Sequence, residues 1–118
     1  MRLEDNFYKI HAIEKTDVGY KVEVELMANH PIYEGHFPQQ AVVPGVCTLT
    51  IIRECLARIL SKPVAFVGIK ECKYVSALIP QNDLRCVINL TLTEGVVNAV
   101  VVRADSLQTV LKLKANLG

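Results

Sequence analysis

Apolar and polar residues alternate with a period of two over long parts of the chain, and such alternation predicts β-strands with one buried face. The alternating segments cover residues 8–12, 18–27, 64–75, 84–93, 96–104 and 107–114. In the second of them, one face would carry Tyr20, Val22, Val24 and Leu26, and the other Lys21, Glu23 and Glu25. Turn-forming residues predict turns at 17–19, 80–83 and 94–95.

A single segment has helical spacing instead. Its apolar residues recur every three or four positions, at Val46, Leu49, Ile52, Leu56, Ile59 and Leu60. They predict a helix over residues 46–61, which Pro63 ends. Because Cys47, Ile51 and Cys55 make this helix apolar almost all round, we expect it to be buried. The pattern predicts an α+β fold of one domain over residues 1–118, with antiparallel strands around a central helix.

The irregular segment at residues 29–44 holds the first candidate for chemistry, because a loop of this length in a compact domain is usually functional or disordered. His36 lies between Gly35 and Phe37-Pro38, which restrain the backbone on both sides. A neutral imidazole there is a usable general base near neutral pH; alternatively, His36 only caps a turn. His11 and His30 lack such surroundings, and we expect turn or surface roles for them.

The start of the predicted helix is the second candidate. The first backbone N–H groups of a helix have no partner within it, and Gly45 lets a ligand approach closely. These donors could polarise a carbonyl group in the manner of an oxyanion hole. A base together with a carbonyl-polarising helix end is what proton removal next to a thioester or ketone requires.

Composition and charge narrow the class of protein. Hydrophobic residues make up 51% of the 118 residues and charged residues 21%, which excludes a disordered chain. The net charge of +1 argues against a basic nucleic-acid-binding face. No apolar run approaches a membrane span and residues 1–6 lack a signal-peptide core, so we expect a cytoplasmic protein. The apolar surplus of so short a chain predicts contact with a second copy.

The cysteines give no sign of a metal site. Cys47, Cys55, Cys72 and Cys86 lie far apart, without a C-x-x-C pair or a Cys/His cluster. Disulfides are arithmetically possible, but in a chain that is not exported we expect four buried thiols and no metal.

Several short motifs follow one another in a set order. They are Gly35-His36-Phe37-Pro38, Val42-Val43-Pro44-Gly45-Val46, Val67-Gly68-Ile69-Lys70 with Tyr74, and Leu78-Ile79-Pro80-Gln81-Asn82-Asp83. Their order and spacing, over roughly residues 7–115, resemble the hot-dog-fold 3-hydroxyacyl-acyl-carrier-protein dehydratases. The resemblance implies a hot-dog fold, with His36 as the catalytic base and the Gly45 N–H on the thioester carbonyl. It also implies that the Val42 carbonyl orients His36 and that Phe37, Pro38 and Val46 lie at the substrate.

Three positions depart from the family pattern. Thr50 stands where the family has a Glu or Asp, fourteen residues after the histidine. A hydroxyl cannot replace that proton donor, although it can hold water or the substrate hydroxyl by a hydrogen bond. Glu54 lies one turn further along the same helical face and is a candidate for a displaced acid; alternatively, it pairs with Arg53 or Arg58. Gln39 and Ala41 replace a usual glycine and proline.

The leading hypothesis is therefore a 3-hydroxyacyl-thioester dehydratase that acts on an acyl carrier protein or coenzyme A thioester, with His36, Thr50 and Glu54 at its site. The resemblance implies a homodimer, with a hexamer open, and no cofactor. Lys70, Lys73 and Arg85 are candidates for docking an acidic carrier protein. The alternatives are a non-catalytic acyl-binding or scaffold subunit that pairs with a competent partner and, ranked lowest, an acyl thioesterase.

Overall fold

The computed structural model describes residues 3–27, 43–81 and 83–118. In chain order its elements are β1 (Tyr8–Lys15), β2 (Gly19–Leu26), α1 (Gly45–Leu60), β3 (Phe66–Tyr74), β4 (Leu84–Thr93), β5 (Val96–Arg103) and β6 (Thr109–Leu117). None of the helical residues described forms a helix long and apolar enough to cross a membrane.

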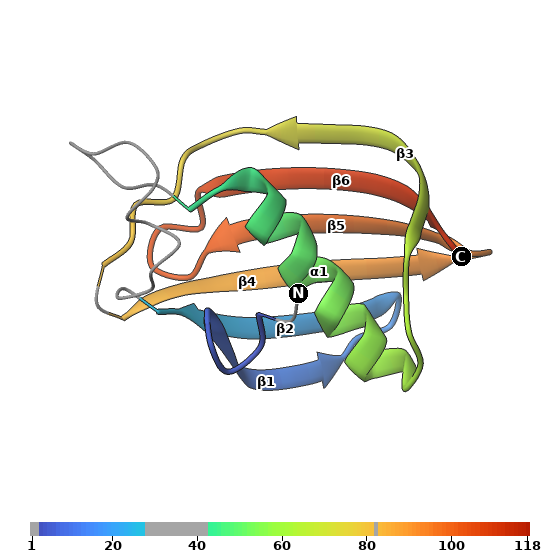
Figure 1. Ribbon diagram of the computed structural model, residues 1–118, viewed down its shortest axis with the longest axis horizontal. Coiled ribbons are helices and arrows are strands. Elements are labelled where there is room, and N and C mark those ends of the chain that lie inside the picture. Colours follow the sequence, from blue (N-terminus) through green and yellow to red (C-terminus); the bar gives the residue numbers. More distant parts are fainter. Residues whose placement is uncertain (1–2, 28–42, 82) are drawn as a thin grey trace.

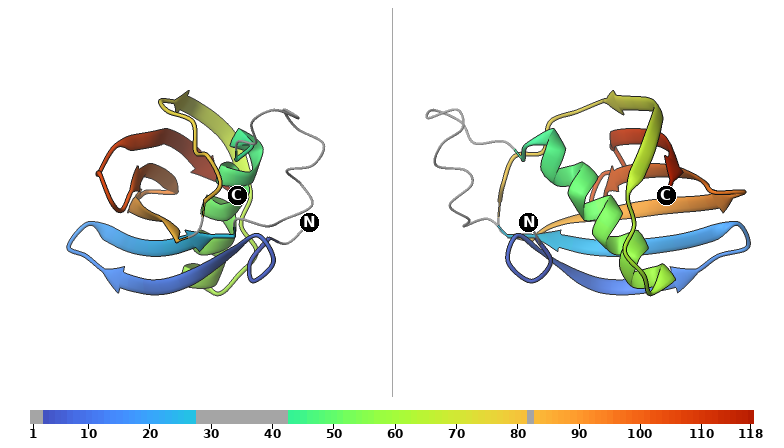
Figure 2. Two further views of the ribbon diagram at one scale, coloured as in Figure 1. Left: turned by 90° about the vertical axis from the view of Figure 1, so that its left-hand side faces the viewer. Right: turned by 45° about the vertical axis from the view of Figure 1, so that its right-hand side comes forward.

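All six strands form one antiparallel sheet in the order β1-β2-β4-β5-β6-β3. The sheet curves around α1, which crosses its concave side (Figures 1 and 2). The fold predicted from the pattern, antiparallel strands around one helix, is therefore confirmed. Strands β1 and β3 lie at the two edges of the sheet.

The predicted alternation places the core correctly. Val22, Val24 and Leu26 of β2 are buried, and the pairing register sets them opposite Ile88, Cys86 and Leu84 of β4, which are buried as well. Exposed or half-buried Lys21, Glu23 and Glu25 alternate with them. Because successive side chains of a strand point to opposite faces, this register directs one apolar set toward the helix.

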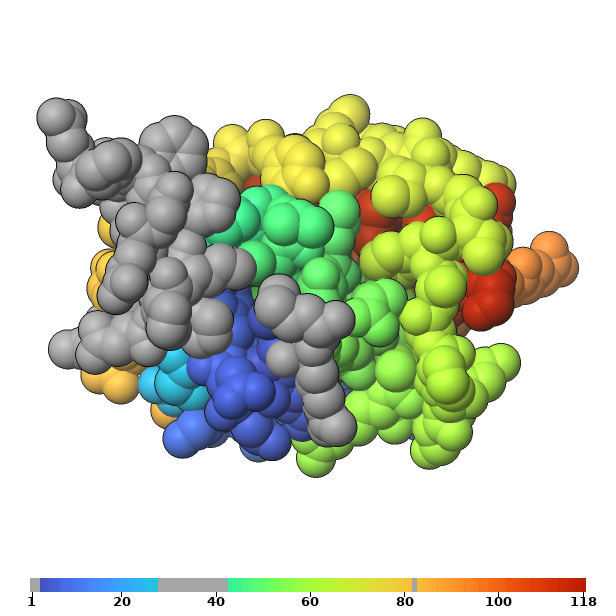
Figure 3. All heavy atoms as spheres, viewed as in Figure 1, coloured from blue at the N-terminus to red at the C-terminus, as the bar shows by residue number. Residues whose placement is uncertain are grey.

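The helix meets this apolar face with one side only. Its buried residues are Cys47, Thr48, Ile51, Ile52, Glu54, Cys55 and Leu56. Val46 is 67% exposed, and part of α1 is visible at the surface beside the N-terminal segment (Figure 3). The expectation of a helix buried all round is therefore wrong for one subunit, because the sheet covers a single side of it.

Element boundaries differ from the prediction by a few residues. The helix begins one residue earlier, at Gly45, and ends at Leu60, where Ser61 adopts a left-handed conformation and donates its N–H to the Ala57 carbonyl. This cap and Pro63 together end the helix. The strand predicted from residue 107 runs instead from Thr109 to Leu117, because the turn after β5 takes in Leu107, whose φ is 60°.

An N-terminal turn packs beneath the helix, which the pattern did not predict. Leu3 and Phe7 are buried, and the Phe7 N–H donates to the Leu3 carbonyl over 2.7 Å. The Met27 N–H in turn donates to the Phe7 carbonyl over 2.9 Å, which joins this turn to the end of β2.

The close approach of β2 to β4 gives a first prediction. A Cβ added at Gly19 would overlap the Leu90 carbonyl oxygen and lie 3.0 Å from the Thr91 Cα, all of it backbone. We expect Gly19→Ala to lower the free energy of unfolding by about 2 kcal/mol, measured by urea denaturation. Gly68→Ala is the control, because its Cβ would contact only the movable Asn116 side chain. Equal stability of the two variants would contradict this contact.

Candidate active site at the start of the helix

The chain reaches α1 through a tethered segment. The Val43 N–H donates to the Leu78 carbonyl over 2.8 Å, which fixes the approach to the helix against the connection between β3 and β4. Pro44 is the N-cap and provides no side-chain hydrogen bond to the first turn. Since the first N–H groups of a helix have no acceptor within it, the turn that begins at Gly45 presents donors to whatever lies in front of it.

The Tyr74 side chain lies directly against Gly45. A Cβ built on Gly45 would overlap the tyrosine ring, with the ring Cζ at 2.8 Å and the hydroxyl Oη at 3.0 Å. Only glycine leaves room for an aromatic ring at this distance. The end of β3 and the start of α1 are thus in contact, and a larger residue at position 45 would require the exposed Tyr74 ring to shift.

A cavity of about 280 Å³ opens beside this contact. It is lined by Val43, Gly45, Thr48, Tyr74, Val75, Ser76, Ala77, Leu78, Val110 and Leu111. Most of these side chains are apolar, while Thr48, only 6% exposed, brings a hydroxyl to the wall. A largely apolar cavity with a few polar groups suits a chain molecule with a polar head.

Thr50 lies five residues after Gly45, on the second turn of the helix, and is half-buried. Its hydroxyl donates a hydrogen bond of 2.9 Å to the Val46 carbonyl, four residues earlier. This is the usual way in which threonine satisfies its hydroxyl within a helix. The oxygen keeps its capacity to accept a hydrogen bond, but its proton is directed at the backbone.

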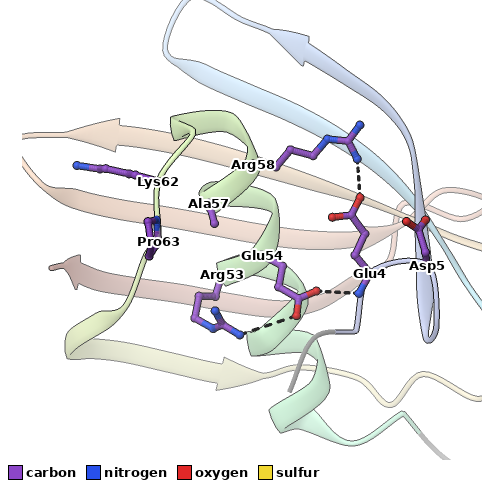
Figure 4. A pocket seen from close by; sticks show the side chains of 8 residues that line it. All are labelled: Glu4, Asp5, Arg53, Glu54, Ala57, Arg58, Lys62 and Pro63. Carbon is purple, nitrogen blue, oxygen red and sulfur yellow. Dashed lines mark hydrogen bonds and ion pairs between the residues drawn. The ribbon is translucent and has the colours of Figure 1, made fainter.

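Glu54 is engaged by the N-terminal turn (Figure 4). Its Oε2 accepts a hydrogen bond from the Leu3 N–H over 2.8 Å, and its Oε1 accepts one from the Glu4 N–H over 2.9 Å. The buried Tyr8 hydroxyl donates to Oε1 over 3.1 Å. A carboxylate only 8% exposed is tolerated here because three donors replace its hydration.

The arginines expected to pair with Glu54 lie farther from its carboxylate than these three donors, or pair elsewhere. The Arg53 guanidinium lies 3.8 Å from the carboxylate, and Arg58 pairs with Glu4 instead. These residues line an open, polar cavity of about 810 Å³ on the second half of the helix (Figure 4). Nine residues of helix separate Glu54 from Gly45, which is about 13 Å along the axis. Within one subunit the two residues therefore belong to different cavities.

The remaining site residues are placed only in part. His36, Phe37, Pro38 and Val42 lie outside the described residues, as do Gln39 and Ala41. Val46 is exposed next to Gly45.

The candidate docking cations do not form one patch, because Lys70 and Lys73 are on β3 and Arg85 is on β4, with β5 and β6 between these strands. Lys73 pairs with Glu71 over 3.2 Å and Arg85 with Glu23 over 3.1 Å.

Three of the four cysteines are buried, as predicted, whereas Cys72, on the edge strand β3, is not. All four are free thiols, with Cys47, Cys55 and Cys86 buried and Cys72 half-buried. Burial raises the pKa of Cys55 to about 12 and that of Cys86 to about 11, so neither forms a thiolate near neutral pH. Among the described residues no cluster of His, Cys, Asp and Glu is suited to hold a metal ion.

Sequence reasoning missed Tyr74 and Thr48 as site residues. Tyr74 stood out only as part of a later motif, and nothing near it in the chain indicates that its ring reaches Gly45. Thr48 is three residues after Gly45 and so shares its helical face, which is a signal that the spacing could have provided.

Comparison with known proteins places the chain among dehydratases. The ApeI-like family model, described as ApeI dehydratase, matches residues 12–110. The 3-hydroxyacyl-[acyl-carrier-protein] dehydratase FabZ of Clostridium botulinum (strain Loch Maree / Type A3) is 36% identical over 89 residues, which are 70% of this chain and 60% of that protein. FabZ of Macrococcus caseolyticus is 30% identical over 82 residues, 60% of this chain and 54% of that one. The chain thus spans about 60% of the length of the first of these relatives.

Two solved structures share the fold. The dehydratase heterocomplex ApeI:P from Xenorhabdus doucetiae superposes with a TM-score of 0.77 at 18% identity, covering 92% of this chain and 95% of that one. An uncharacterized protein from Erwinia carotovora subsp. atroseptica superposes with a TM-score of 0.71 at 24% identity, covering 92% and 91%. These likenesses confirm the predicted hot-dog fold.

The contacts of Glu54 predict a structural role that can be measured. We expect Glu54→Ala to lower the free energy of unfolding by about 2–3 kcal/mol, because buried donors lose a charged acceptor. The N-terminal turn should also become more sensitive to limited proteolysis. Glu14→Ala, which removes an exposed carboxylate of β1, is the control and should change neither measurement. If the Glu54 variant is as stable as this control, Glu54 does not hold the N-terminal turn.

Proposed function

The chain belongs to the family of ApeI-like dehydratases, and from this premise we propose that it removes water from 3-hydroxyacyl thioesters to give trans-2-enoyl thioesters. The acyl chain is carried by an acyl carrier protein or by coenzyme A. The observation that carries the proposal is the start of α1, where Gly45, a residue of the family motif, lines a largely apolar cavity. In this proposal the protein acts in the cytoplasm and needs no cofactor, because dehydration moves only a proton and a hydroxide.

The thioester carbonyl is bound at the helix start. The Gly45 N–H donates to the carbonyl oxygen and draws electron density from C2, so the C2 proton becomes more acidic. The imidazole of His36 removes that proton, with Phe37, Pro38 and the Val42 carbonyl holding the ring in place. The largely apolar cavity beside Gly45 receives the acyl chain. Val46, exposed next to Gly45, contacts the substrate in this proposal.

In this mechanism His36 alone both removes the C2 proton and protonates the leaving hydroxyl. The C2–H bond breaks first and its proton forms the imidazolium. The C3–O bond then breaks, and the imidazolium returns the proton to the departing hydroxyl, which leaves as water. We assign this step to His36 because the Glu54 oxygens accept from the N-terminal turn and the Thr50 proton is directed at the Val46 carbonyl. Thr50 retains the role of accepting a hydrogen bond from the substrate hydroxyl.

The partner of this subunit in our proposal is a second copy, joined through the edge strand β3. Among the described strands β3 pairs only with β6, so its outer edge carries unpaired backbone groups. Exposed apolar side chains accompany this edge: Val67 is 67% exposed and Ile69 51%. A second β3 would extend the sheet and cover them. The hexamer is a further step of assembly within the same proposal.

A second candidate function is favoured by the hydrogen bonds that engage Thr50, at the usual acid position, and Glu54, the candidate for a displaced acid. The similar structure from Xenorhabdus doucetiae is a heterocomplex of dehydratase subunits. A subunit whose Glu54 and Thr50 are both engaged could bind the acyl chain while a different partner supplies the acid. Turnover by the purified chain alone supports the first function, whereas turnover only after mixing with a related subunit that carries the acid supports the second.

The role of His36 gives a test of the chemistry. We expect His36→Ala to reduce turnover of a 3-hydroxyacyl-pantetheine thioester by about 10³-fold, because the variant has no base for the C2 proton. Formation of the enoyl thioester, followed by its ultraviolet absorbance, is the measurement. His11→Ala is the control, since His11 is exposed on β1 and pairs with Glu25. Unchanged turnover by His36→Ala would refute the mechanism.

The edge strand gives a test of the assembly. We expect Ile69→Lys to weaken the dimer by at least about 100-fold in analytical ultracentrifugation, because an interface that buries an unpaired charge is strongly destabilised. Val18→Lys places the same charge on another exposed apolar position, in the turn before β2, and should leave the dimer intact. A dimer that withstands the charge on β3 would exclude this edge as the interface.

A further inference from the structure

The structure places the polar side chain of Tyr74 next to the start of α1. It is the last residue of β3, and its ring covers the position that a Cβ of Gly45 would take. The side chain is 59% exposed and also lines the cavity beside Gly45. The phenol therefore belongs to the wall of this cavity and is accessible from solvent.

The distances allow Tyr74 and Gly45 to share one acceptor. The Tyr74 Oη lies 3.0 Å from the ideal Cβ position of Gly45. In standard geometry that position is about 2.5 Å from the nitrogen of the same residue, so Oη is at most about 5.5 Å from the Gly45 nitrogen. Two donors that bind one oxygen at about 2.9 Å each can be up to about 5.8 Å apart. A single carbonyl oxygen can thus accept from both groups.

We propose that the Tyr74 hydroxyl is a second hydrogen-bond donor to the thioester carbonyl, next to the Gly45 N–H. The inference rests on the proposed function and extends it by one catalytic residue. Tyr74 transfers no proton: the C2 proton passes to His36 and leaves with the hydroxyl as water. The phenol stabilises the negative charge that gathers on the carbonyl oxygen as the C2–H bond breaks.

The phenol is suited to donate rather than to ionise. Burial raises the pKa of Tyr74, and a hydrogen bond with the Cys72 thiol raises it further, so the hydroxyl keeps its proton throughout the neutral range. Cys72 lies two residues earlier on the same strand and is therefore a neighbour on the same face. Sulfur is a weak acceptor, and a polarised carbonyl oxygen readily replaces it as the partner of the hydroxyl.

This chain has a particular need for a second donor. Thr50 stands in place of the acid that would protonate the leaving hydroxyl, so the C3–O bond receives little help as it breaks. More negative charge then accumulates on C2 and on the carbonyl oxygen before water leaves. Stronger hydrogen bonding to the carbonyl lowers the free energy of that charge and offsets the missing acid.

The matched test removes one oxygen atom from the side chain. We expect Tyr74→Phe, which keeps the ring on Gly45, to lower kcat by about 100-fold with little change in KM for 3-hydroxyacyl-pantetheine thioesters. Tyr20→Phe is the control, because Tyr20 is a half-buried residue of β2 that does not line the cavity, and its activity should match the original protein. A fully active Tyr74→Phe would overturn the inference and leave the proposed function standing.

A spectroscopic measurement separates a carbonyl contact from a structural role. An enoyl-pantetheine thioester labelled with ¹³C at the carbonyl is bound to each protein, and its C=O stretch is recorded by infrared difference spectroscopy. Binding to the original protein should shift the band to lower frequency, and Tyr74→Phe should lose part of this shift at saturation. An identical shift in both proteins would overturn the inference. Absence of turnover by the original protein, alone and with a related subunit, would instead refute the proposed function.

Discussion

The packing of α1 against the concave face of the sheet is the contact on which the rest of the subunit depends. Ile52, Cys55 and Leu56 are fully buried between the helix and the strands. Burial of an isoleucine or leucine side chain of this kind stabilises the fold by about 1.5–3 kcal/mol. The sheet must curve to reach around the helix, and this curvature leaves β1 and β3 as open edges rather than closing a barrel. The position of the helix therefore sets both the core and the surfaces that a partner can use.

The two ends of the helix serve different purposes as a result. At its start Gly45 faces Tyr74 and the largely apolar cavity, where backbone donors are available. In its second half Glu54 holds the N-terminal turn through three donors. One carboxylate cannot both satisfy these donors and protonate a substrate bound about 13 Å away along the helix. Glu54 does lie on the same helical face as Thr50. The distance along the helix nevertheless separates Glu54 from the site at Gly45 within the subunit.

In the proposed mechanism, the threonine at position 50 makes stabilisation of the carbonyl oxygen more important. An elimination can be assisted at the base, at the leaving group or at the carbonyl oxygen, and weakness at one of them raises the charge that the others must stabilise. In the reaction that we propose, Thr50 stands in place of that acid, so the base and the carbonyl donors would stabilise more of the developing charge. A helix start, a phenol and a largely apolar cavity form a setting in which hydrogen bonds to a developing charge are stronger than in water.

Local pattern was sufficient for the elements and for the glycine at the helix start. Period-two alternation and helical spacing are properties of neighbouring residues, so β2, β4 and α1 could be predicted nearly to the residue, and the motif around Gly45 led to the family. The partners of Glu54 and Tyr74 could not be predicted, because Leu3 and Gly45 reach them only through the order and register of the sheet. Burial on the outer side of α1 was misjudged for a related reason: an apolar stripe shows that a surface will be covered, but the covering element is decided by the tertiary structure.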